Sequence, residues 1–149
     1  MVDVSRTTTR SPIRTATMVV SVVFLLVGIA GFIPGITTHY DTMTFAGHDS
    51  GAKLFGVFQV SILHNIVHLL YGVVGLIMAR TAAAARAYLI AGGAVYLILW
   101  IYGLVTDKMS GANFVPVNRP DDWLHFALGV GMVGLGLALG RGYRTRPEV

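Results

Sequence analysis

Apolar stretches of about 20 residues alternate with polar segments along the whole chain. They lie at about residues 15–34, 54–79, 86–105 and 123–140. Each stretch is close to the roughly 20 residues that an α-helix needs to cross the hydrocarbon core of a bilayer. Gly31-Phe-Ile-Pro-Gly35 ends the first one, because proline cannot continue a helix and glycine is a natural C-cap. The pattern predicts an all-α protein, an integral membrane four-helix bundle over residues 15–140.

The second stretch carries polar or small side chains along one face. At 100° per residue, an arc of roughly 120° holds a set of these side chains. They are Ser61, His64, Asn65, His68, Tyr71, Gly72 and Gly75. A polar face inside a membrane must meet another helix, a ligand or a partner protein. The sequence alone does not choose among the three.

The fourth stretch repeats part of this face. Asn65 to Val73 and Asp122 to Val130 both read [Asn/Asp]-x-[Val/Leu]-His-x-x-x-Gly-Val. One face of the fourth helix also collects polar or small side chains, namely Asp122, His125, Gly129, Met132, Gly136 and Gly140. Because helices two and four would run in the same direction, duplication would give two parallel copies of a helical hairpin. Chance similarity between two glycine-containing apolar helices is the alternative, and both readings stay open.

Composition and charge support a membrane protein with a defined orientation. The chain is 54% hydrophobic and 12% charged, with a mean hydropathy of +0.69. Eight of the eleven Lys and Arg residues lie in the N-terminus, the 80–86 connector and the tail. By the positive-inside rule, 1–14 is a cytoplasmic N-terminal segment and 141–149 a basic cytoplasmic tail. This placement favours contact with lipid headgroups and no nucleic acid partner.

Aromatic residues gather toward the far end of the third stretch. Tyr96, Trp100 and Tyr102 have the placement expected of an aromatic belt at the membrane interface.

The intramembrane histidines have three readings. His64 and His68, at i and i+4, project from one helix face and could bind a metal if Asp121 or Asp122 supplied a further ligand. Haem could be held between His68 and His125, provided that their depths match and a flat macrocycle has room. The favoured reading is structural: the imidazoles hydrogen-bond neighbouring groups and hold the helices together. It implies neither a metal site nor a cofactor.

Enzyme signatures are missing from the sequence. It contains no GxSxG, Walker A or HExxH motif, and no acidic residue within the apolar cores. A proton-coupled transporter would normally carry such an acid. The chain has no cysteine, which excludes disulfides, thiolate metal sites and a thiol nucleophile. Its 18 glycines instead indicate close helix packing, within the chain or against another protein.

Several motifs together indicate a family. They are Gly31-Phe-Ile-Pro-Gly35-Ile-Thr37, Leu54-Phe-Gly-Val-Phe-Gln59, His64-Asn65-x-x-His68 with Gly72, and Asn118-x-x-Asp121-Asp122-Trp-Leu-His125 with Gly129. In their order over residues 14–140 the chain resembles a family of small four-helix membrane proteins. The family is found mostly in actinobacteria and is catalogued only as a domain of unknown function. The resemblance implies a bacterial plasma membrane location and four spans, and it brings no activity or cofactor.

The leading hypothesis is a small non-enzymatic membrane protein. It would be an accessory or scaffolding subunit of a membrane complex, or a homo-oligomer, with the polar face of helix two and the glycine faces as contact surfaces. Its partners would be membrane lipids and a membrane protein or further copies of itself. The alternative is a haem- or metal-binding protein that uses His68, His125 and His64. A lower alternative is an oligomeric channel for a small solute or protons.

Overall fold

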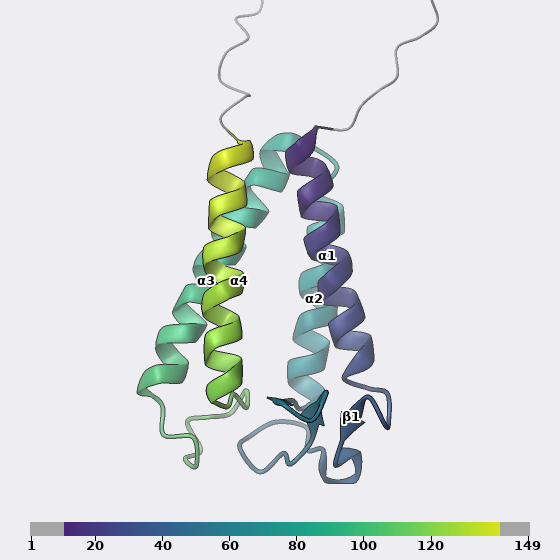
Figure 1. Cartoon of the computed structure of the whole chain (residues 1–149), viewed down its shortest axis with the longest axis vertical. Coiled ribbons are helices and arrows are strands. Elements are labelled where there is room, and N and C mark those ends of the chain that lie inside the picture. The colour runs from purple at the N-terminus through teal and green to yellow at the C-terminus, as the bar shows by residue number, and fades with distance from the viewer. Residues whose placement is uncertain (1–10, 141–149) are drawn as a thin grey trace, which may run out of the picture.

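The computed structural model describes residues 11–140, which form four antiparallel helices standing side by side (Figure 1). The helices are α1 (Pro12–Ala30), α2 (Ile62–Met78), α3 (Ala82–Val105) and α4 (Arg119–Leu139). Most of the predicted N-terminal segment and all of the basic tail lie outside the described residues. α1 begins and α4 ends at the same end of the bundle, here named the terminus end.

The fold confirms the predicted all-α four-helix bundle, and its composition is compatible with a membrane. α1, α3 and α4 are long enough to cross a bilayer, with mean hydropathies of 2.2, 1.9 and 1.5. α2 has 17 residues and is shorter. Large apolar side chains face outward, for example Leu26 at 60% and Ile98 at 65% exposure. An outer surface of this kind suits lipid rather than water.

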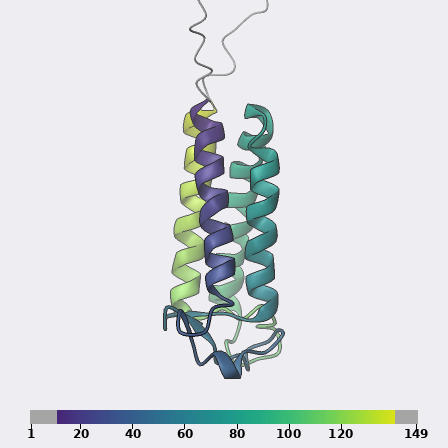
Figure 2. The same ribbon diagram turned by 90° about the vertical axis from the view of Figure 1, so that its right-hand side faces the viewer.

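A small sheet and two loops cover the opposite end of the bundle (Figure 2). This loop end comprises residues 31–61 and 106–118. Its strands β1 (Thr37–Thr38), β2 (Lys53–Leu54) and β3 (Phe58–Gln59) pair antiparallel in the order β1-β2-β3. α2 therefore begins at Ile62 and not near residue 54 as predicted. The apolar residues that were predicted to form the first turns of this helix belong instead to the β2–β3 hairpin. The hairpin turns through Phe55 and Gly56, whose φ angles are 54° and 71°.

Side-chain caps fix where three of the helices begin. Ser61 and Thr81 accept hydrogen bonds from the third residue of α2 and of α3, at 3.1 and 3.2 Å. Asn118 and Asp121 form a reciprocal capping box at the start of α4. As a result α3 and α4 each begin about four residues earlier than predicted. The alanine run after Arg80 is the first turn of α3 and not a separate connector.

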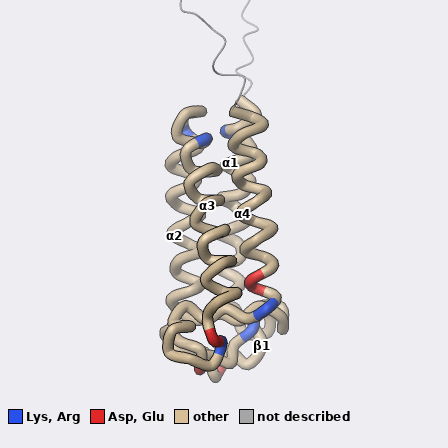
Figure 3. The backbone as a smooth tube through the Cα atoms, turned by 90° about the vertical axis from the view of Figure 1, so that its left-hand side faces the viewer, with Lys and Arg blue, Asp and Glu red and all other residues tan. Residues whose placement is uncertain are grey.

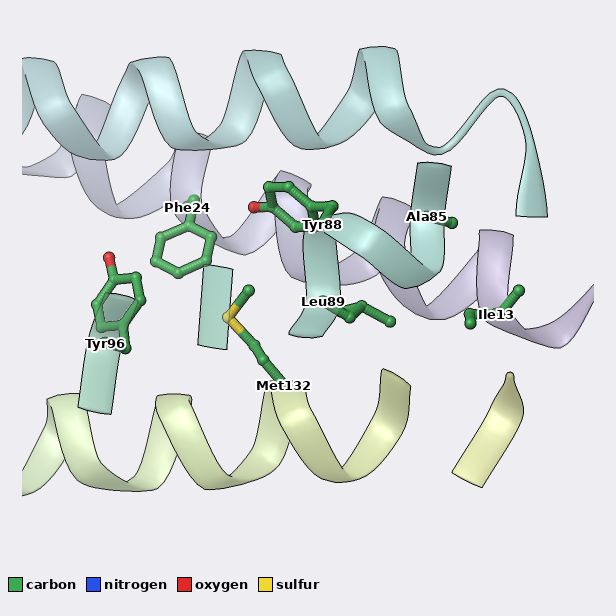
Figure 4. Packing of buried hydrophobic residues seen from close by; sticks show 7 residues of the cluster. All are labelled: Ile13, Phe24, Ala85, Tyr88, Leu89, Tyr96 and Met132. Carbon is green, nitrogen blue, oxygen red and sulfur yellow. The ribbon is translucent and has the colours of Figure 1, made fainter. Parts of the chain in front are cut away.

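The helices form two tightly packed hairpins, α1 with α2 and α3 with α4. Fewer contacts join one hairpin to the other. A cluster of buried side chains from α1, α3 and α4 lies between them (Figure 4). Its members are Ile13, Phe24, Ala85, Tyr88, Leu89, Tyr96 and Met132. This cluster is the core that joins the two hairpins.

The two hairpins repeat each other's contacts. The shared sequence motif relates His68 of α2 to His125 of α4. A Cβ atom on Gly72 would lie 2.6 Å from Cγ of Leu25 in α1, and one on Gly129 would lie 2.7 Å from Cγ of Leu97 in α3. Gly72 and Gly129 are equivalent positions of the motif, and each receives a leucine from the helix before it.

A second pair of contacts follows the same relation. A Cβ atom on Gly31 would collide with the side chain of Asn65, and one on Gly103 would collide with Asp122. Asn65 and Asp122 are again equivalent positions of the motif. The spacing from Leu25 to Gly31 is the same as the spacing from Leu97 to Gly103. Because both helices of each hairpin keep this register, the structure supports internal duplication over chance similarity.

Charged residues lie near the two ends of the bundle, and the acidic ones lie at one end alone within the described residues (Figure 3). The terminus end of the described chain carries three arginines, Arg14, Arg80 and Arg86. All five aspartates of residues 11–140 belong to the loop end or to the start of α4, namely Asp41, Asp49, Asp107, Asp121 and Asp122. The terminus end is therefore purely basic within the described residues.

Candidate functional site

The polar faces predicted on α2 and α4 lie inside the bundle. On α2 the exposed fraction is 0% for Asn65, 3% for His64 and 8% for His68, and on α4 it is 3% for His125. The other members are also buried, except that Tyr71 is half-buried: Ser61, Gly72, Gly75, Asp122, Gly129, Met132, Gly136 and Gly140. The structure therefore assigns both faces to helix packing within one chain. As a contact surface for a second protein they are not accessible.

Three histidines meet near the loop end of the bundle. The ring centroid of His64 lies 4.7 Å from that of His68 and 6.2 Å from that of His125. Aromatic rings of α1 and α3 flank the group, with Phe24 5.9 Å from His68 and Tyr96 5.2 Å from His125. The sequence-predicted histidines of two helices are thus brought into one buried cluster, which we name the histidine cluster.

The histidine cluster borders a small internal cavity of about 30 Å³. The Nδ1 atoms of His64, His68 and His125 are buried and have no hydrogen-bond partner among the described residues. A neutral imidazole offers one donor and one acceptor, so the rings of His68 and His125 retain unused hydrogen-bonding capacity. A cavity of this size can hold one or two water molecules. The arrangement is suited to bridging the three rings through water.

The two aspartates considered as further metal ligands are engaged elsewhere. Asp121 accepts hydrogen bonds from the backbone N–H groups of Gln59, at 3.1 Å, and Asn118, at 2.9 Å. Asp122 forms an ion pair with Lys108, whose Nζ lies 2.8 Å from the carboxylate. Across residues 11–140, no group of three or more His, Asp or Glu side chains is placed to hold a metal ion. Asp121 and Asp122 thus link the loops to α4.

Haem does not fit between His68 and His125. Pockets for small molecules usually measure about 300–1,000 Å³, whereas the cavity that these histidines share measures about 30 Å³. The space beside Gly72 and Gly129 is also filled, by leucines of the neighbouring helices. The packing of the bundle therefore gives no support to the haem alternative.

We expect the purified protein to show no Soret band after expression in haem-replete cells. The physical reason is the lack of space for a macrocycle beside His68 and His125. An absorption spectrum of the detergent-purified protein over the near-ultraviolet and visible range checks this. A Soret band that disappears in His68→Ala but persists in His39→Ala, a change in the distant loop, would contradict it.

Sequence reasoning missed several polar groups that hold the bundle together. Tyr88 donates a hydrogen bond from its hydroxyl to the backbone carbonyl of Tyr71 at 3.1 Å, which ties α3 to α2. Thr17 and Ser21 are fully buried on α1, an otherwise largely apolar helix. Their spacing of four residues places both on one helix face, a signal that could have been read from the sequence.

The predicted aromatic belt is only partly realised. Tyr96 is buried, with its ring 5.4 Å from Phe24 and 5.2 Å from Tyr71, and it belongs to the core. Trp100 packs against Phe126 with ring centroids 4.7 Å apart. Tyr102 donates a hydrogen bond from its hydroxyl to the carbonyl of Ala112 in the following loop. Phe24 precedes Leu25 on α1 as Tyr96 precedes Leu97 on α3, so the two aromatic residues occupy equivalent positions of the repeat, and both face inward.

The chain belongs to the family described as domain of unknown function DUF4383, whose model matches residues 14–138. The expected resemblance to a family of unknown function is thereby confirmed. No curated protein and no solved structure is significantly similar to the chain. The expected actinobacterial origin stays a prediction.

Proposed function

We propose that this protein is a non-enzymatic integral membrane protein that serves as an accessory or scaffolding subunit of a membrane complex, or that assembles with its own copies. The proposal is carried by one observation, a stripe of small residues on α4 that the other described residues leave uncovered and that is distinct from the buried face of this helix. This stripe replaces the buried polar faces as the expected contact surface.

The stripe lies on the outward side of α4. It consists of Ala127, Gly131, Gly134 and Ala138, all exposed and spaced to share one face. A Cβ atom on Gly131 or Gly134 would meet nothing within 4 Å, whereas one on Gly136 would lie 2.7 Å from Ile90. Small residues let membrane helices approach closely, and a glycine costs a helix about 1 kcal/mol relative to alanine. A partner helix would offset this cost.

We place the protein in the bacterial plasma membrane with four spans and both termini in the cytoplasm. Eight of the eleven Lys and Arg residues lie in the N-terminus, the 80–86 segment and the tail, and this excess supports the orientation through the positive-inside rule. α2 spans roughly 25 Å at 1.5 Å per residue, near the lower limit for crossing. A channel formed by several copies receives no support, because the polar face of α2 is enclosed within one chain.

Co-purification tests the proposal. A tagged copy is purified from native membranes in mild detergent, and its companions are quantified by mass spectrometry. We expect a membrane protein in stoichiometric amount, or further copies of the chain, to co-purify with the unsubstituted protein (the parent). Ala127→Leu should reduce that companion at least severalfold, because a leucine would hold the helices apart. Ala94→Leu adds the same atoms at an exposed position of α3 and should leave it unchanged.

Two outcomes would contradict the proposal. One is purification of the parent as a monomer without a companion. The other is a companion that Ala127→Leu and Ala94→Leu affect equally. A differently tagged second copy separates self-association from binding of another protein, since only self-association brings both tags into one complex.

A further inference from the structure

A groove between α2 and α3 opens from the bundle toward lipid. Its volume is about 390 Å³, and its walls are lined mainly by Val67, Val74 and Met78 of α2 and by Ala87, Ala91 and Val95 of α3. Val74 and Val95 are 46% and 44% exposed, so the groove is accessible from outside. In Figure 1 the two helices join at the terminus end and separate toward the loop end. The volume falls within the range of small-molecule pockets.

The groove offers no free hydroxyl to a ligand. Tyr71 and Tyr88 contribute ring atoms to its walls. The Tyr71 hydroxyl, however, donates to the carbonyl of Gly92 at 2.9 Å, and the Tyr88 hydroxyl donates to the carbonyl of Tyr71 at 3.1 Å. The remaining lining side chains are apolar. A ligand with polar groups along its length would lose its hydrogen bonds there, so a hydrocarbon chain is the fitting occupant.

The terminus end of the groove adds a positive charge. The turn over residues 79–81 joins the two walls, and it carries Arg80, which is exposed. Every aspartate of residues 11–140 belongs to the other end of the bundle or to the start of α4, so Arg80 faces no described acidic side chain. The planar guanidinium group binds phosphate in a bidentate geometry.

The neighbouring arginines lie against other helices. Arg14 donates a hydrogen bond from Nε to the carbonyl of Ala79 at 2.9 Å, at the C-terminus of α2. The Arg86 side chain lies over the end of α4, where a Cβ atom on Gly140 would be 2.5 Å from its Cδ. Arg80 lies in the turn that joins the two walls and its side chain has no hydrogen bond or ion pair among the described residues, so its guanidinium is available to a ligand, and Arg86 provides a control.

We propose that this groove is a binding site for one anionic phospholipid, with an acyl chain between α2 and α3 and the phosphate group on Arg80. The apolar walls favour the acyl chain as the buried part of the ligand. The unpaired guanidinium of Arg80 selects the anionic headgroup. The site does not depend on whether the stripe on α4 binds another protein, because the two surfaces belong to different helices.

Native mass spectrometry of the full chain in mild detergent tests the headgroup preference. Purified protein is titrated with phosphatidylglycerol and with phosphatidylcholine of identical acyl chains. We expect one phosphatidylglycerol to bind about fivefold more tightly, the preference that one arginine near the membrane surface typically provides. Arg80→Gln should remove the preference, whereas Arg86→Gln should retain it. Equal affinity of the parent for both lipids, or equal effects of the two substitutions, would overturn the headgroup assignment.

A second set of variants tests whether the acyl chain lies in the groove. Ala91→Trp fills the groove and should lower the affinity for both lipids at least tenfold, while Ala94→Trp, outside the groove on the same helix, should not. Circular dichroism verifies folding, and Ala91→Leu replaces a tryptophan variant that fails to fold. Unchanged binding in a folded Ala91 variant would overturn the site. Displacement of phosphatidylglycerol by an isoprenoid quinone at equal concentration would also overturn it, in favour of that ligand class.

Discussion

Gly72→Ala is expected to lower the free energy of unfolding by about 1–3 kcal/mol, the usual cost of overpacking an interior. The new methyl carbon would lie 2.6 Å from Cγ of Leu25 and 2.8 Å from the backbone carbonyl oxygen of Ser21. A side chain can rotate away, but the carbonyl belongs to α1 and moves only with that helix. Substitution therefore forces α1 and α2 apart where their backbones pack closely.

Unfolding in mixed detergent and dodecyl sulfate micelles, followed by circular dichroism, measures this loss. Gly131→Ala is the control, because its methyl group would meet no atom within 4 Å. Alanine favours a helix over glycine by about 1 kcal/mol, so the control should leave stability unchanged or raise it. Gly129→Ala, at the equivalent position of the second hairpin, should be destabilising like Gly72→Ala. Equal stability of Gly72→Ala and Gly131→Ala would show that α1 and α2 do not pack as described.

The number and order of the helices could be predicted because apolar length alone indicates a membrane span. The start of α2 could not. Leu54, Val57 and Phe58 are as apolar in a hairpin as in a helix, so hydropathy does not separate the two. The hairpin depends on a left-handed backbone conformation at Phe55, which residues other than glycine rarely adopt. It also depends on a hydrogen bond from the Phe55 N–H to the carbonyl of Ile36, distant in sequence, at 2.9 Å.

The residues of the candidate site could be predicted, but their surroundings could not. Helical periodicity shows that His64 and His68 share a face, and the repeated motif relates His68 to His125. Periodicity does not show which helix such a face meets. The small cavity also depends on Val115 and Val117, residues of a loop that folds back over the bundle. Nothing in the spacing of the histidines encodes the path of that loop.

The Lys108–Asp122 ion pair is the other place where a single substitution should have a large effect. The Asp122 side chain is 4% exposed and the Lys108 side chain 28%, with 2.8 Å between nitrogen and oxygen. Lys108 also donates a hydrogen bond to the Gly103 carbonyl at 2.6 Å. Lys108→Met leaves a buried carboxylate unpaired, and we expect it to cost about 3 kcal/mol of unfolding free energy. Asp122→Asn should cost less, because the half-exposed lysine can turn toward water.

A double-mutant cycle separates the charge from the shape of this site. In the first hairpin the equivalent position holds Asn65, which packs against Gly31 as Asp122 packs against Gly103. The bundle thus already accommodates a neutral amide in this geometry. We therefore expect Lys108→Met/Asp122→Asn to be more stable than Lys108→Met alone, since the second change removes the unpaired charge. The same micelle unfolding assay measures all four proteins. If the double variant were no more stable than Lys108→Met, the loss would come from the packing of the lysine side chain and not from the buried charge.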